Sequence, residues 1–120
     1  MDFVHQTSPQ IFPTEDGKII LEHFGKVATS TTEISIAHMK APAGWSEPVQ
    51  TPEFDEYTLM VSGTKRVVVN GTTIELNAGE SLLVRAGSTV QYANPYTEEA
   101  VYWSICLPAF SPETAHRVED

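Results

Sequence analysis

Residues 56–79 read EYTLMVSGTKRVVVNGTTIELNAG, which is three β-rich runs separated by short turns. Asn70-Gly71 lies between two runs rich in Val, Ile and Thr, and a type I′ hairpin turn needs positive φ at both of its central positions. Ser62-Gly63 and the turn at 77–79 close the runs on either side. This stretch therefore predicts a strand followed by a tight antiparallel hairpin.

Similar short runs continue on both sides of this stretch. They lie at residues 18–24, 32–40, 81–85, 89–92 and 100–107, with Gly, Pro and Asn between most of them. Helical periodicity is nearly absent, although Ser111 before Pro112 predicts one capped helical turn. About eight short strands indicate an all-β sandwich or barrel. We expect one domain over residues 1–120, with a core at 18–107 and a C-terminal arm at 108–120.

Composition excludes several classes of function. The chain has 120 residues and a net charge of −9, which nucleic-acid backbones would repel, so we expect no nucleic-acid partner. No apolar run approaches the ~18 residues of a membrane span, so we expect no membrane partner. The N-terminus shows no signal peptide, and Cys106 is the single cysteine. A reducing, cytoplasmic location is the expectation.

Glycines recur at fixed distances from one carboxylate and one amide. The first set begins at Gly44 and places Glu56 seven residues before Gly63; the second contains Gly79, Gly87 and Asn94. These spacings resemble the two motifs of the cupin family. The segments 44–56 (GWSEPVQTPEFDE) and 106–117 (CLPAFSPETAHR) also resemble a subgroup of small single-domain cupins. The resemblance implies an all-β, RmlC-like jelly-roll barrel (a double-stranded β-helix). It also implies that the protein forms a homodimer, as small cupins commonly do.

The resemblance also implies a metal site of three histidines and one glutamate, and here the histidines are replaced. Their three places fall on Gln50, Pro52 and Val90, while Glu56 is kept. One amide oxygen and one carboxylate hold a transition metal weakly. We therefore predict no tightly bound metal or other cofactor; if a divalent metal binds, Glu56 and Gln50 are its expected ligands.

Glu56 is the predicted catalytic residue, because a carboxylate inside a barrel has a raised pKa that suits general acid–base chemistry. Strand alternation predicts that Thr58 and Met60 share its inward face, and that Tyr92 shares the inward face of Val90. A few polar groups among apolar ones are typical of a small-molecule site. The predicted substrate-binding residues are Gln50, Tyr92, Trp45, Thr58, Met60, Val90 and His38.

Three hypotheses of different classes stay open. The first is a barrel that binds a small organic molecule, acting as an isomerase, cyclase or lyase through Glu56 without a tight metal. The second is a metal-dependent enzyme with an oxygen-rich site that includes Glu47, Glu53 or Asp55. The third is a non-catalytic binding or assembly module. In all three, Cys106 is expected to be an inert buried thiol. His116-Arg117 is expected to be a solvated end, a cover over the barrel mouth or a contact with a dimer partner.

Overall fold

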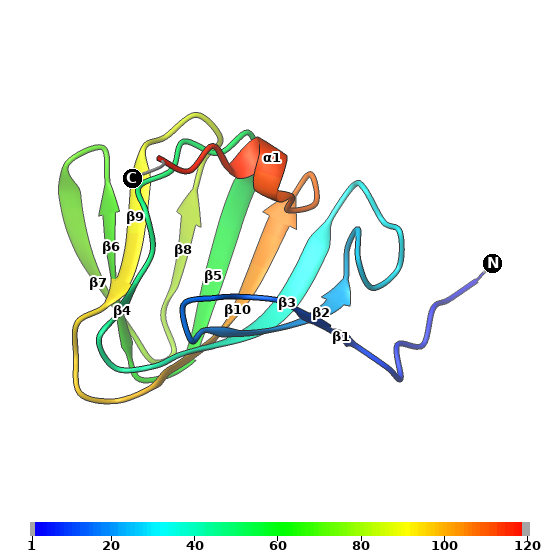
Figure 1. The fold of residues 1–120 in the computed structure, drawn as a ribbon, viewed down its shortest axis with the longest axis horizontal. Coiled ribbons are helices and arrows are strands. Elements are labelled where there is room, and N and C mark those ends of the chain that lie inside the picture. Colours follow the sequence, from blue (N-terminus) through cyan, green and yellow to red (C-terminus); the bar gives the residue numbers. More distant parts are fainter. Residues whose placement is uncertain (1, 119–120) are drawn as a thin grey trace.

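A computed structural model describes residues 2–118, and nearly all of its regular structure is β (Figure 1). A single short helix, α1 (Pro112–Ala115), follows the last strand. The strands are β1 (Gln10–Phe12), β2 (Ile19–Phe24), β3 (Ser35–Ala41), β4 (Trp45–Ser46), β5 (Asp55–Ser62), β6 (Thr64–Val69), β7 (Thr72–Asn77), β8 (Ser81–Val84), β9 (Val90–Asn94) and β10 (Ala100–Leu107).

The strands form two antiparallel sheets. The larger sheet has the order β1-β2-β3-β10-β5-β8 and the smaller has the order β4-β9-β6-β7. Figure 1 shows them as the two walls of a barrel, with α1 and the C-terminal arm passing over one end. The apolar core takes side chains from both walls, among them Met60 and Tyr102 from the larger sheet and Val67, Val90 and Tyr92 from the smaller. No helix in the described part of the chain is long and apolar enough to span a membrane.

The predicted strands are confirmed, and two further short ones are present. The hairpin of β6 and β7 turns at Asn70 and Gly71, whose φ angles of 47° and 85° are both positive as the sequence predicts. β1 and β4 were not predicted, because three-residue and two-residue runs are too short to show alternation. β1 matters for the site, since it brings Phe12 beside Phe110 of the C-terminal arm, with ring centroids 5.6 Å apart.

The retained amide of the second motif has a structural role. The Asn94 side chain is fully buried, and its Nδ2 donates to the carbonyl oxygens of Ala41, Pro42 and Glu98 at 3.1, 3.2 and 2.8 Å. These bonds tie the end of β9 to the β3–β4 connection and to the loop before β10. Asn94 is therefore a residue that holds the barrel end together rather than one that faces a ligand.

The retained Gly63 is required by its surroundings as well as by its backbone. Its φ is 75°, and a Cβ at this position would meet the Glu99 carbonyl oxygen and lie 3.0 Å from the Ala100 Cα. Gly71 has a similar φ of 85° but nothing within 4 Å of an added Cβ. We expect Gly63→Ala to lower the free energy of unfolding by about 3 kcal/mol and Gly71→Ala by about 1 kcal/mol.

Urea unfolding of the two variants measures this difference, and Gly71→Ala is the matched control because it carries the backbone strain alone. Equal losses for the two variants would contradict the role assigned to the Glu99–Ala100 backbone.

The C-terminal arm packs onto the barrel. Ser111 caps α1, its Oγ accepting from the Thr114 backbone N–H at 3.3 Å, as predicted. Phe54, Cys106 and Ala115 form a small second core under α1, with Phe110 against it. Past α1, the Val118 N–H donates to the Val49 carbonyl oxygen at 2.8 Å. The arm is thus held over one end of the barrel on both sides of Arg117.

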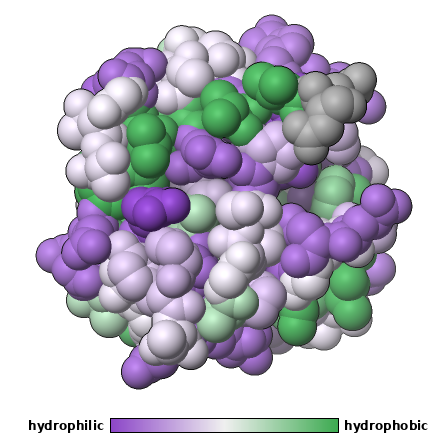
Figure 2. All heavy atoms as spheres, turned by 60° about the vertical axis from the view of Figure 1, so that its left-hand side comes forward, coloured by the Kyte–Doolittle hydropathy of each residue, from purple (hydrophilic) through white to green (hydrophobic). Residues whose placement is uncertain are grey.

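The two sheets present different outer faces. The side brought forward in Figure 2 is mostly hydrophilic or neutral, with smaller hydrophobic patches, and β7 exposes polar residues. The outer face of the larger sheet is more apolar: Tyr57, Leu59 and Val61 of β5 are 40%, 41% and 54% exposed.

Candidate functional site

A partly enclosed cavity of about 40 Å³ lies between the two sheets, and its lining includes Phe110 and Arg117 of the C-terminal arm. A cavity of that size accommodates about three water molecules or a few heavy atoms of a ligand. Its charged and polar lining comes from both walls and from the arm: Lys18, Glu22, Ser35, Glu47, Gln50, Glu56, Lys65, Tyr92, Tyr102, Ser104, Cys106 and Arg117. Nonpolar side chains, among them Ala37, Met39 and Phe110, complete it.

Glu56 lies on the inward face of β5, as alternation predicts. Thr58 and Met60, two and four residues further on, are buried, whereas Tyr57 and Leu59 between them are exposed. The Ser104 hydroxyl of β10 donates to Glu56 Oε2 at 2.7 Å. Burial raises the pKa of the Glu56 carboxyl above its usual 4.5, and the charge of Lys65 and the Ser104 hydrogen bond partly oppose that rise. The carboxyl is therefore held in place and can carry a proton closer to neutral pH.

Lys65 of β6 brings a cation into the same cavity from the opposite wall. Its side chain is 2% exposed, and its Nζ lies 4.3 Å from the ring centroid of Tyr92 and 3.7 Å from that of Tyr102. Burial lowers the pKa of the Lys65 ammonium from 10.5 to about 8, although the nearby Glu56 acts in the opposite direction. Glu56 and Lys65 are thus an acid and a base whose burial moves both pKa values toward neutrality.

Two phenols complete this inner part of the cavity. The hydroxyl groups of Tyr92 and Tyr102 are buried and have no hydrogen-bond partner among the described residues. Burial raises both of their pKa values well above 10, so both hydroxyls keep their protons. An unpaired buried hydroxyl costs free energy unless something bonds to it. Both phenols are therefore available to donate to a ligand oxygen.

A second charged cluster closes the mouth of the cavity. Glu47 is buried and accepts from Lys18 Nζ at 2.9 Å and from an Arg117 guanidinium nitrogen at 3.3 Å. Arg117 Nε also donates to Gln50 Oε1 at 3.2 Å. Gln50 is tied to β9 through backbone bonds with Val90 at 2.9 and 2.8 Å. The arm is therefore fastened to the barrel by charge, and Arg117 lies over the cavity mouth, whereas His116 is exposed and bonded to Glu53.

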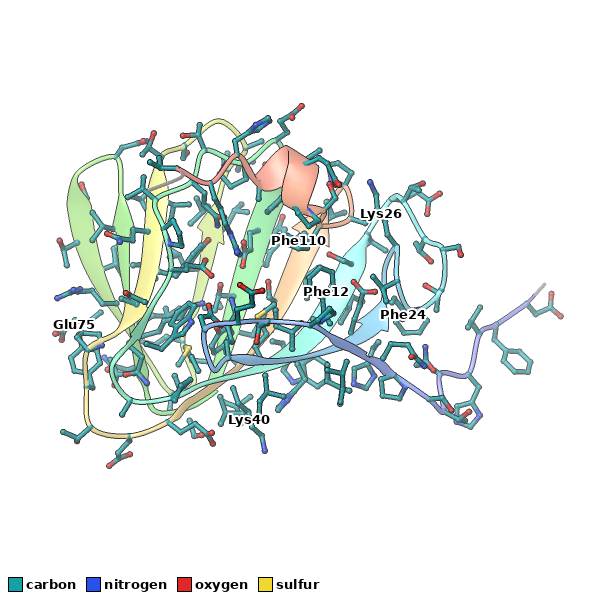
Figure 3. The ribbon with its side chains drawn as sticks, in the orientation of Figure 1. Phe12, Phe24, Lys26, Lys40, Glu75 and Phe110 are labelled. Atoms are coloured by element: carbon teal, nitrogen blue, oxygen red, sulfur yellow. The ribbon has the colours of Figure 1, made fainter. Side chains whose placement is uncertain are left out.

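A larger open groove begins where the cavity ends. It has a volume of about 740 Å³ and shares five lining residues with the cavity: Phe12, Lys18, Ile20, Phe110 and Arg117. Figure 3 shows Phe12 and Phe110 side by side at this place, one from β1 and the other from the arm. A ligand larger than the cavity can lie in this groove while one end reaches the inner groups.

The structure places three of the predicted site residues at the cavity, namely Glu56, Gln50 and Tyr92. Trp45, Met60 and Val90 belong instead to the apolar core, and Thr58 is buried without reaching the cavity. The Trp45 indole N–H is taken by Asp16 Oδ2 at 2.8 Å. The inward direction predicted for Thr58, Met60 and Val90 agrees with their burial, but neither these three nor Trp45 lines the cavity, because the apolar core fills that part of the barrel.

The prediction for His38 was wrong in direction. On β3 the cavity is lined by Ser35, Ala37 and Met39, so His38 points to the outer face of the sheet. Its ring there packs edge-on against Trp103, with centroids 4.9 Å apart. Alternation along β3 did not reveal this, because His38 shares its phase with the large apolar Ile36 while the smaller Ala37 faces the cavity.

Glu47, Glu53 and Asp55, the residues considered for an oxygen-rich metal site, do not form a cluster. Asp55 accepts from the Ala86 N–H at 2.8 Å, Glu53 is exposed and bonded to His116, and Glu47 is neutralised by two cations. Within residues 2–118, no group of three or more His, Cys, Asp or Glu side chains is placed to hold a metal ion. The set of donors around Glu56 consists of a hydroxyl, two phenols and an ammonium, which does not fit a divalent metal.

A barrel of two facing antiparallel sheets with a polar interior cavity defines a jelly-roll protein of the cupin class. The chain belongs to the cupin family, since the family model described as "Cupin domain" matches residues 37–107. An RmlC-like cupin from Shewanella frigidimarina superposes with a TM-score of 0.73, at 18% identity, over 91% of this chain and 92% of that one. The polyketide cyclase RemF from Streptomyces resistomycificus superposes with a TM-score of 0.75, at 13% identity, over 100% of this chain and 87% of that one.

One curated protein is much more similar in sequence. It is named endoribonuclease YbeY, from Myxococcus xanthus, and is 47% identical over 107 residues. The match covers 89% of this chain but only 36% of that protein, so the chain spans about a third of the length of the relative it matches.

Proposed function

We propose that this protein binds a small organic molecule and transfers protons on it without a tightly held metal, as an isomerase, cyclase or lyase. The observation that supports this most is that Glu56, fixed by Ser104 at 2.7 Å, shares a cavity with the buried ammonium of Lys65. Paired groups whose pKa values are moved by their surroundings are typical of acid–base sites.

Each inner residue has a distinct part in the proposed reaction. Glu56 takes a proton from carbon and returns it to another atom, and Ser104 orients the carboxyl. The negative charge that forms on the substrate oxygen is stabilised by Lys65 and by hydrogen bonds from the two tyrosines. Gln50 and Arg117 hold the arm that excludes water. These steps need no oxidant, reductant or Lewis acid.

A cation already stands in the cavity, and this supports the metal-independent form of the proposal. The ammonium of Lys65 supplies one positive charge next to Glu56, and a divalent ion placed beside it would be repelled. In this proposal Glu56, the glutamate kept from the family motif, acts together with Lys65 and not with metal-binding histidines.

The names of the relatives fit the proposal unequally. RemF is a polyketide cyclase, and cyclisation is among the proton-transfer reactions proposed here. The ribonuclease named for the Myxococcus protein is not proposed for this chain, because most of that protein lies outside the match and a net charge of −9 opposes RNA binding. A cytoplasmic location, in which Cys106 stays reduced, and a homodimer are parts of the proposal.

Deuterium exchange tests the proposed function before the natural substrate is known. Pyruvate, hydroxyacetone and glycolaldehyde are incubated with the protein in D₂O, and loss of the proton signal on the carbon next to the carbonyl is followed by NMR. We expect exchange above the buffer rate for at least one probe. Exchange at the buffer rate for all three would contradict proton transfer on small carbonyl compounds.

A further inference from the structure

The four lysines of the chain have very different surroundings. Lys26 and Lys40 are exposed and lie outside the barrel in Figure 3. Lys18 is buried but ion-paired with Glu47 at 2.9 Å. Lys65 is buried, and it takes part in none of the ion pairs within 4 Å found among residues 2–118. It is the one described lysine that faces the cavity with its ammonium on aromatic rings alone.

A buried lysine that has no ion-pair partner within 4 Å is costly for stability, so its position suggests a use. Here the amine lies in the same cavity as a fixed carboxyl and two unpaired phenol groups. A nucleophile beside a general acid and hydrogen-bond donors is the arrangement that captures a carbonyl group.

From this arrangement we infer that Lys65 is a nucleophile that forms an imine with the carbonyl carbon of a small aldehyde or ketone. The inference rests on the proposed function and makes it more specific, because it names carbonyl compounds as the substrate class and assigns Lys65 a covalent role.

The reaction balances with the groups present. The neutral amine of Lys65 adds to the carbonyl carbon, and the proton it loses passes to the carbonyl oxygen to give a carbinolamine. The protonated Glu56 then donates a proton to that hydroxyl group, which leaves as water while the C=N bond forms. The iminium makes the neighbouring carbon more acidic, and the Glu56 carboxylate can then remove a proton from it.

The size of the site limits the part of the substrate that enters. The cavity of about 40 Å³ takes only the carbonyl end, whereas the adjoining groove of about 740 Å³ can hold a larger remainder. The pKa of about 8 for Lys65 supports its role as a nucleophile independently of the size of the cavity. At pH 7 the neutral fraction of such an amine is about 300-fold larger than that of a lysine with a pKa of 10.5.

Reductive trapping tests the inference. The wild-type protein is incubated at pH 7 with glycolaldehyde or pyruvate and sodium cyanoborohydride, and peptide mass spectrometry follows the adduct at each lysine over time. We expect Lys65 to be labelled at least tenfold faster than Lys40 with one of the two probes. Lys65→Arg keeps the charge but should lose the fast adduct, whereas Lys26→Arg, which changes an exposed lysine outside the cavity, should keep it.

Two further variants test the role of Glu56 in the labelling reaction and the access of the probe to the cavity. Glu56→Gln should slow the Lys65 adduct by at least tenfold, since the proton for the departing hydroxyl is lost. Arg117→Ala should speed it, because the arm is then released from Glu47 and Gln50.

Failure of this inference can be told apart from failure of the proposed function. Labelling of Lys65 no faster than that of Lys40 in both wild type and Arg117→Ala would overturn the nucleophile. If deuterium exchange that depends on Glu56 persisted in that case, proton transfer would stand and only the covalent role would be lost. Absence of both would overturn both.

Discussion

Glu56→Gln is expected to slow deuterium exchange on the responsive carbonyl probe by 10²- to 10⁴-fold, about the range that a positioned general acid or base contributes. Glutamine has nearly the same shape and can still accept from Ser104, so the cavity should keep its form. What the variant lacks is a group that takes up and releases a proton. The initial rate of proton loss, followed by NMR in D₂O, measures the effect.

The matched control is Glu99→Gln, because Glu99 is exposed and directly precedes β10, at the end of this strand that is opposite to the C-terminal arm. It removes the same charge from the protein and should leave the exchange rate within about twofold. Undiminished exchange in Glu56→Gln, with a folded protein by circular dichroism, would remove Glu56 from the mechanism and leave its raised pKa as a consequence of burial alone.

Lys65→Met is expected to remove a pH dependence of stability rather than simply to destabilise the protein. Lys65 has a pKa of about 8 when folded and 10.5 when unfolded, so between these values the unfolded chain binds more protons. The cost of burying the cation is present in full below pH 8 and disappears as pH rises toward 10.5. Between pH 7 and pH 10, the free energy of unfolding of the wild-type protein should therefore rise by about 2 kcal/mol relative to that of the Lys65→Met variant.

Urea unfolding of both proteins at several pH values provides this comparison, and only the difference between them is used. The difference cancels the ionisation of other groups in the cavity to first order, including Tyr92, Tyr102 and Cys106, whose pKa values burial raises. Lys40→Met is the control and should run parallel to wild type, since Lys40 is exposed. A constant difference between wild type and Lys65→Met across this range would contradict a buried, weakened base.

The fold was largely predictable because its signals are local. Asn70-Gly71 determines the turn of its hairpin through backbone φ alone, and alternation along β5 places Glu56 inside without knowledge of the rest of the chain. Gly63 and Asn94 keep motif spacing for reasons that the structure explains, a close backbone approach in one case and three buried hydrogen bonds in the other.

The site was only partly predictable because it is made by contacts between distant segments. Lys65 shares its inward phase with Val67, so alternation along β6 could have identified it. Its two aromatic partners come from β9 and β10, and no spacing rule connects them to it. Likewise, the ion pair of Arg117 with Glu47 joins residues 70 positions apart, and a short polar tail carries no pattern that predicts where it folds.

The central claim is that the cavity carries an acid and a base, Glu56 and Lys65, whose burial moves their pKa values toward neutrality. NMR titration of the Glu56 side-chain carboxyl carbon and the Lys65 side-chain amine nitrogen in the folded protein tests this directly. The account predicts a Glu56 midpoint above 4.5 and a Lys65 midpoint near 8. Midpoints of about 4.5 and 10.5, those of solvated side chains, would contradict it.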